Sequence, residues 1–281
     1  MNINSVKVVT FSPTGNSEKV AKSIAKGIQA QTEHINITLP SAKTQNYEEF
    51  HDELTIIAVP VYLGRVPNEA AYRIRRLTAN NTPTVIVVTY GNRAYEDALR
   101  ELNDIVTEVG FKPIAAAVFI GEHSWSIPEI PTAHGRPDDE DLSKAEVFGN
   151  KIREKLERIE KENLLPVETP GRNPYTLRAS MWRPGELMSP YTDDELCTRC
   201  GKCAEVCPTG AVTLKNVVCT PSPRVDLRAV IVTTNPDTCL LCCACVRICP
   251  TSARIRRPRM LQGTKSLSKN NPERKPPETY L

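Results

Sequence analysis

The sequence predicts an α/β protein in two parts: a doubly wound parallel sheet of five strands, followed by a small α+β domain. Short apolar runs rich in β-branched residues alternate with helical patterns through the first half. Near the C-terminus a four-cysteine motif occurs twice, and a proline-rich stretch precedes the first copy. We expect the sheet domain over 1–162, a connection over 163–190, the small domain over 191–260 and a tail over 261–281.

The first element is a short strand over Val6–Thr10, followed by a hydroxyl-rich turn and a helix over Glu18–Ala30. Such a turn presents backbone N–H groups and hydroxyls to an anion, and the helix dipole adds its positive end. The turn lacks the glycine pattern of a dinucleotide fingerprint and the Gly-Lys of a P-loop, which excludes the NAD and ATP motifs. A plain helix cap is the alternative. The residues expected to face the anion are Ser12, Thr14, Gly15, Asn16 and Ser17.

The remaining runs with strand character lie at Ile35–Leu39, Leu54–Val59, Thr84–Tyr90 and Ile114–Ile120. Helical patterns fall near Glu69–Leu77, Tyr95–Val109 and Asp141–Lys161. This alternation predicts parallel strands with short loops at their carboxyl ends.

Two of these loops, Pro60–Pro67 and Tyr90–Tyr95, each combine tyrosine with glycine. They offer a flat ring for stacking and a backbone that a planar ligand can approach closely. A tyrosine at a strand end can also reflect β propensity alone. The candidate ligand contacts are Pro60, Tyr62, Gly64, Arg65, Tyr90, Gly91, Asn92, Arg93 and Tyr95.

The cysteine pattern is C-x2-C-x2-C-x3-C-P in both runs, the spacing with which bacterial-type ferredoxins hold 4Fe-4S clusters. In two-cluster ferredoxins the fourth cysteine of each run binds the other cluster. This resemblance assigns Cys197, Cys200, Cys203 and Cys249 to one cluster, and Cys239, Cys242, Cys245 and Cys207 to the second. Zinc is the alternative, but a zinc ribbon has no use for third and fourth cysteines at these intervals. Cys219 and Cys243 are out of phase, and we expect them to be small buried residues.

The N-terminal turn resembles the phosphate loop of flavodoxins, and the five strands fit their order 2-1-3-4-5, in which FMN lies between strands 1 and 3. Together with the cysteine repeat, the chain resembles EFR1-type ferredoxins, which carry an N-terminal flavodoxin-like domain. The resemblance implies an FMN and two 4Fe-4S clusters, with Tyr62 and Tyr95 stacking on the flavin and Tyr90 as the next candidate. It implies an electron carrier with a redox partner protein. A flavin-dependent reductase and a redox-sensing regulator are the alternatives.

Four further features lead to separate expectations. Lys215–Thr234 exceeds what a minimal ferredoxin needs and predicts an added hairpin or flap. Leu165–Asp193 carries Tyr175, Trp182 and Met188, which we expect to hold it along the surface. The polar tail Gln262–Leu281 predicts disorder, although its last two residues would allow docking. His123 follows the fifth strand and either borders the ligand or lies exposed without a partner.

The formal net charge is +3, and the strongest basic cluster is Arg254, Arg256, Arg257 and Arg259. Because no nucleic-acid recognition motif accompanies it, we expect it to dock onto the acidic first domain or an acidic partner. Arg65 and Arg93 would either raise the flavin potential or lie at the surface. No signal peptide or membrane helix is predicted, so we expect a cytoplasmic protein whose cysteines bind metal. The sequence does not indicate the oligomeric state.

Overall fold

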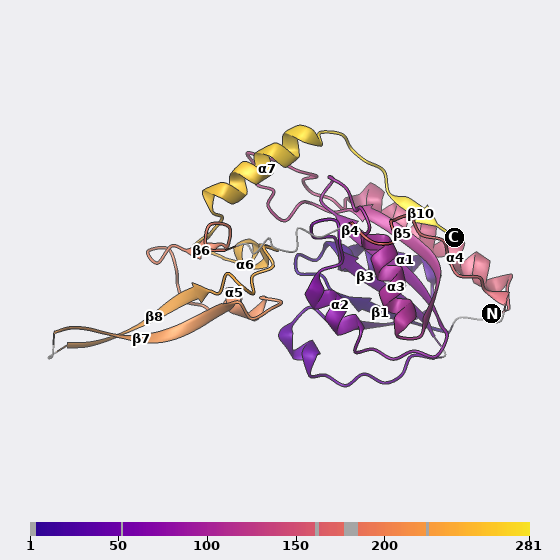
Figure 1. Ribbon diagram of the computed structural model, residues 1–281, viewed down its shortest axis with the longest axis horizontal. Helices are drawn as coiled ribbons and strands as arrows, with labels where there is room; N and C mark the ends of the chain where they lie inside the picture. Colours follow the sequence, from indigo (N-terminus) through magenta and orange to yellow (C-terminus); the bar gives the residue numbers. More distant parts are fainter. Residues whose placement is uncertain (1–3, 52, 161–162, 177–184, 223–224) are drawn as a thin grey trace.

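We describe a computed structural model of the chain over residues 4–51, 53–160, 163–176, 185–222 and 225–281, with 217–229 described by their backbone only. A parallel α/β domain and a smaller, cysteine-rich domain lie side by side, and a long hairpin projects from the smaller one (Figure 1). None of the helices in this described part of the chain is both long and apolar enough to cross a membrane.

Five parallel strands form the body of the sheet: β1 (Ser5–Thr10), β2 (Gln31–Asn36), β3 (Leu54–Pro60), β4 (Thr82–Tyr90) and β5 (Phe111–Ile120). Their spatial order is β2-β1-β3-β4-β5, so the predicted flavodoxin-like order is confirmed. Strand β2 begins earlier than expected because it is an edge strand: its polar residues at 31–33 are exposed and give no apolar signal. The short 3-10 helix η1 (Pro40–Lys43) follows soon after it.

Helices cover both faces of the sheet. Helices α1 (Asn16–Ile28) and α4 (Asp139–Glu157) pack on one face, and α2 (Asn68–Ile74) and α3 (Ala98–Glu108) pack on the other. The two cores follow the strand period of two: in β1, Val8 faces α1 and α4, whereas Val9 faces the opposite core. Glycine allows α1 and α4 to cross closely, because a Cβ on Gly27 would lie 2.0 Å from the Glu146 carbonyl oxygen.

The small domain is a repeat in structure as well as in sequence. Its first half comprises β6 (Tyr191–Thr192), α5 (Lys202–Glu205) and β7 (Val212–Ser222); its second half comprises β8 (Val225–Thr234), α6 (Ala244–Arg247) and β9 (Arg254–Ile255). Strand β6 pairs with β9, and β7 pairs with β8. The end of each half is therefore held beside the start of the other. The predicted added hairpin is confirmed as β7–β8, which extends away from both domains (Figure 1).

The C-terminal segment is ordered, so the prediction of a disordered tail is wrong. It forms α7 (Pro258–Asn270) and then returns to the large sheet as β10 (Glu278–Tyr280), antiparallel to β5 (Figure 1). The Asn92 side chain donates to the carbonyl oxygens of Asn271 and Glu273 at 2.9 and 2.8 Å. Tyr95 donates to the Glu278 carboxylate at 2.7 Å. These contacts lie far apart in sequence, which is why composition alone missed them.

Part of the proline-rich connection lies along α3. The Asp97 carboxylate accepts the backbone N–H groups of Arg172 and Thr176 at 2.8 and 2.7 Å. The Tyr175 hydroxyl donates to Asp104, and its ring stacks under the Arg65 guanidinium at 4.3 Å. The expected surface course is therefore seen for this part, whereas Trp182 lies outside the described residues.

Candidate functional site

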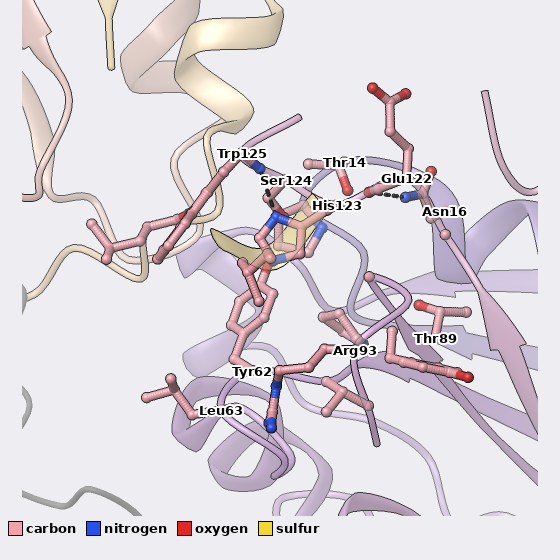
Figure 2. Close-up of a pocket in the computed structure, with 18 of the residues that line it drawn as sticks. Thr14, Asn16, Tyr62, Leu63, Thr89, Arg93, Glu122, His123, Ser124 and Trp125 are labelled. Atoms are coloured by element: carbon pink, nitrogen blue, oxygen red, sulfur yellow. Dashed lines mark hydrogen bonds between the residues drawn. The ribbon is translucent and has the colours of Figure 1, made fainter. Parts of the chain in front are cut away.

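A cavity of about 430 Å³ lies at the carboxyl ends of β1, β3 and β4. This edge of an open parallel sheet is where such folds bind their ligands. Figure 2 shows side chains from the loops that follow the strands, including Thr14, Tyr62, Arg93 and His123, around this cavity. The predicted residues that line it are Ser12, Thr14, Asn16, Ser17, Pro60, Tyr62, Gly64, Tyr90, Gly91 and Arg93.

The turn after β1 is fixed by hydrogen bonds that leave room for an anion. Ser12 Oγ accepts the Glu18 N–H at 3.1 Å, and the Asn16 amide donates to the Glu122 carbonyl oxygen at 3.1 Å. Ser17 and Thr89 hydroxyls share a 2.5 Å hydrogen bond. Gly15 occupies the N-cap of α1 at φ 84° and supplies no side-chain cap. The helix N-terminus therefore has N–H groups to offer a phosphate.

His123 is half-buried in the cavity wall, so the reading of an exposed histidine without a partner is wrong. Its Nδ1 accepts the Trp125 backbone N–H at 3.1 Å, which fixes the neutral tautomer with its proton on Nε2 (Figure 2). Burial, together with the charges of Arg247 and Arg93, lowers the pKa of His123 from 6.5 to about 4. A Cβ on Gly91 would lie 2.3 Å from the ring, so this glycine is required for the close approach.

The aromatic side chains of the cavity reach toward the second cysteine run. Burial, with the nearby Cys242 and Cys243, raises the pKa of Tyr62 well above its ordinary value, although a hydrogen bond with Ser124 acts in the other direction. Burial raises the pKa of Tyr90 to about 12. Both hydroxyls therefore stay protonated at neutral pH and can donate hydrogen bonds.

Four predicted ligand contacts do not line the cavity. Gly15 serves as the turn residue, and the Asn92 side chain holds the C-terminal segment. Tyr95 is directed to Glu278 and packs edge-on against Tyr90, with ring centroids 5.7 Å apart, which corrects its predicted stacking role. Arg65 forms a two-point ion pair with Glu101 at 2.8 and 2.9 Å, away from the cavity.

Other lining residues were not predicted. The ferredoxin-like domain contributes Leu240 and Leu241, and α7 contributes Gly263, Ser266 and Leu267. The Trp125 indole N–H donates to the Leu241 carbonyl oxygen at 2.9 Å and joins the two domains here. An apolar pair inside a ligand loop was the available sequence signal for Leu240 and Leu241. Thr89, a polar residue near the end of a buried strand, was another.

The first set of cysteines surrounds a second, smaller cavity, whose lining includes Cys197, Cys200, Cys203 and Cys249. Cys249 thus lies with the first run, as expected if the fourth ligand crosses over. Burial opposes a charge on Cys249, but backbone N–H groups of Arg254 and Thr251 point at its sulfur, and its pKa is lowered on balance. Thr251 and Thr209 lie against the sulfurs of Cys249 and Cys207 at 3.8 and 3.6 Å, one in each half.

The remaining four cysteines also gather together. Burial is the main cause of the raised pKa values of Cys239 and Cys245, and the proximity of Cys207 contributes to both. Among the described residues, no three His, Cys, Asp or Glu side chains are placed to hold a single metal ion.

Two cysteines, Cys219 and Cys243, lie outside the eight predicted cluster ligands. Cys243 is 1% exposed and its thiol contacts the Met260 sulfur at 3.6 Å, so its prediction as a small buried residue is confirmed. The side chain of Cys219 lies outside the described part of the chain.

The predicted basic cluster is divided between the interior and the surface, and its Arg259 is exposed. Arg254 is buried, Arg257 lies over the Tyr191 ring at 4.4 Å, and Arg256 donates to the Ser124 carbonyl oxygen at 3.3 Å. A separate arginine, Arg247, approaches Glu122 at 3.7 Å. Within the cluster, the contact of Arg256 agrees with docking onto the first domain, whereas Arg254 and Arg257 contact residues beside them in the small domain.

Comparison with protein families matches residues 190–213 to a 4Fe-4S binding domain. Comparison with curated proteins finds no match. Among solved structures, an archaeal flavodoxin is 15% identical, covers 55% of this chain and 99% of its own, and has a TM-score of 0.35. A Streptococcus pneumonia TIGR4 flavodoxin is 16% identical, covers 54% of this chain and 99% of its own, and has a TM-score of 0.37. The rubredoxin oxygen:oxidoreductase of Desulfovibrio gigas is 14% identical, covers 57% of this chain and 37% of its own, and has a TM-score of 0.39. The flavodoxin-like strand order is seen in the sheet itself, and residues 190–213 are similar to a 4Fe-4S binding domain.

The residues present fit the cofactors that these folds carry. The N-terminus of α1, whose N-cap Gly15 supplies no side-chain cap, lies beside hydroxyls for a phosphate, and aromatic side chains lie near it for a planar ring. For the clusters, two sets of four cysteines each join three residues of one run with the fourth of the other.

Proposed function

We propose that this protein passes electrons between two 4Fe-4S clusters and an FMN held in one chain, and exchanges them with a redox partner protein. One observation carries the proposal: Leu240 and Leu241, which lie between the ligands Cys239 and Cys242, form part of the wall of the same cavity as Thr14 and Tyr62. The second cluster loop and the flavin site are therefore one continuous structure. The EFR1-type assignment is part of this proposal.

When bound, FMN exchanges one or two electrons and a cubane exchanges one, so the pair converts between these modes. The chain's own residues have separate tasks. The turn around Thr14 and Asn16 binds the phosphate, while Tyr62 and Tyr90 position the ring. His123 keeps a proton on Nε2 because Nδ1 is already occupied by the Trp125 N–H. The Trp125–Leu241 hydrogen bond holds the two domains together at the cavity.

The experiment is anaerobic purification followed by iron, zinc and flavin analysis. We expect about eight irons per chain and one FMN. Reduction by dithionite should bleach the cluster absorbance and the flavin absorbance together, with no added substrate. Zinc with only trace iron would overturn the proposal, and so would a chain that binds no flavin. Sustained turnover of a small substrate would support the reductase instead.

Cluster-to-flavin contact can be tested with a variant of the shared wall. Leu241→Ala should retain about eight irons but slow electron exchange between clusters and flavin, because it loosens the loop that joins them. Leu214→Ala, an exposed position on β7, is the matched control and should leave that exchange unchanged. Equal rates in both variants would count against a direct route through this wall.

A further inference from the structure

The two halves of the ferredoxin-like domain depart from each other at one buried position. The first run continues as Cys-Pro-Thr-Gly-Ala-Val to Val212, and the second as Cys-Pro-Thr-Ser-Ala-Arg to Arg254. Both residues are buried, at 4% and 2% exposure. An apolar side chain in one half thus corresponds to a permanently charged one in the other.

Arg254 lies between the two sets of cysteines: it lines the cavity beside the first set, and its guanidinium donates to a sulfur of the second. Its Nη2 donates to the Cys245 sulfur at 3.6 Å and to Thr234 Oγ1 at 2.7 Å, and its Nη1 donates to Thr192 Oγ1 at 2.7 Å. Nη2 also donates to the Pro190 carbonyl oxygen at 3.1 Å. Within the described residues, its hydrogen-bond partners are neutral oxygens and this sulfur, so its charge has no carboxylate partner there.

In the other half, Val212 packs with Cys203 and Val232 and can offer no hydrogen bond from its side chain. The two ligand sets also differ in burial: Cys200 is exposed, whereas Cys242 and Cys245 are buried. Adding an electron adds negative charge, which burial disfavours and which a fixed cation or a hydrogen bond to sulfur favours. Burial alone would therefore make the second cluster the harder one to reduce.

We propose that Arg254 is a positioning residue that raises the potential of the cluster held by Cys245 to at least that of the exposed cluster. The proposal rests on the proposed function, since it requires both clusters. Arg254 offsets burial at the cluster nearest the flavin cavity. Arg254 also lines the cavity of the other set, but among the described contacts its guanidinium donates to a sulfur only at Cys245, so we expect the larger effect there.

The experiment is an anaerobic redox titration of the full chain, followed by electron paramagnetic resonance. Arg254→Gln should lower the potential of the Cys245 cluster by at least about 59 mV. For one electron, this shift is a tenfold change in the ratio of oxidised to reduced cluster at a fixed potential. Arg254→Lys keeps the cation and should recover part of the shift. Arg257→Gln is the matched control, because this arginine lies over Tyr191 and Ser189; it should leave both potentials unchanged.

Signals are assigned with Cys200→Ser, which alters the exposed cluster. An unchanged Cys245 cluster potential in Arg254→Gln would overturn the proposal. If Arg254→Gln does not fold, the parent still decides: a Cys245 cluster that titrates more than about 59 mV below the exposed one contradicts the proposal. Failure of the proposed function looks different, since the parent would then contain fewer than about eight irons before any titration.

Discussion

The two halves of the ferredoxin-like domain share one cysteine pattern but have different surroundings. The first half faces solvent with Cys200, and its β7 pairs with β8 of the second half in the projecting hairpin. The second half faces the flavin cavity through Leu240 and Leu241. The pattern accounts for the ligands, whereas the residues between the ligands determine what each half contacts.

The differences fall at matching positions of the repeat. Gly201 at φ 81° corresponds to Cys243 at φ 56°, and Glu205 corresponds to Arg247. Cys243 is buried against Met260 of α7, and Arg247 donates to the His123 carbonyl oxygen at 3.3 Å. At these positions the second half carries residues that contact α7 and the first domain, whereas the first half meets the first domain elsewhere, where Arg73 donates to the Pro208 carbonyl oxygen at 2.5 Å.

The largest expected effect tests whether the halves exchange their fourth ligands. Cys249→Ala should reduce the iron content from about eight to about four per chain and should spare the cluster that Cys242→Ala removes. Iron analysis with electron paramagnetic resonance measures this. Cys243→Ala is the control and should keep all the iron. If Cys249→Ala instead removes the same cluster as Cys242→Ala, each half holds its own cluster.

How much of this was accessible from sequence differs between the parts. The strands and the cysteine repeat follow from local patterns, since β-branched runs and fixed spacings are short-range signals, whereas the strand order was implied by the resemblance to flavodoxins. The tail was mispredicted because its order depends on Asn92 and Tyr95, which lie far away in sequence. Leu240, Leu241 and α7 were missed as cavity residues because they enter the site only when the two domains dock.

The second prediction concerns the loop against which the second half packs. The unfolded chain takes up a proton on His123 below pH 6.5, whereas the folded chain does so only near pH 4. Stability is therefore present above pH 6.5 and is lost as the pH falls toward 4. Between pH 6.5 and 5 the parent should lose about 2 kcal/mol more than His123→Gln. Anaerobic denaturant unfolding at the two pH values measures the difference; equal losses would show that His123 is freely solvated.

A smaller effect is expected from the hydrogen bond that joins the second half to the flavin cavity. Trp125→Phe removes the indole donor to Leu241 but keeps an aromatic ring. Losing one such bond costs about 1 kcal/mol, so FMN should dissociate about fivefold more readily. Arg199→Gln is the control in the first half, where Arg199 is exposed and donates to the Val230 carbonyl oxygen at 2.6 Å. If both variants weaken FMN binding equally, the contact is general rather than specific to the second half.

The smallest expected effect distinguishes two arginines of the flavin loops. Arg93 lines the cavity, but its side chain is 45% exposed and is paired with Glu96 at 2.5 Å. Water and the carboxylate screen its charge. Arg93→Gln should therefore lower the flavin potential by less than about 59 mV, which for one electron is a tenfold change in the ratio of oxidised to reduced flavin. Arg65→Gln should leave that potential unchanged, because Arg65 pairs with Glu101 outside the cavity. Redox titration of both variants with FMN bound measures this.

A larger shift for Arg65→Gln than for Arg93→Gln would mean that distant ion pairs, rather than the cavity wall, control the flavin potential. It would also weaken the contrast between the halves, since Arg254 owes its proposed effect to being buried and unscreened where Arg93 is neither.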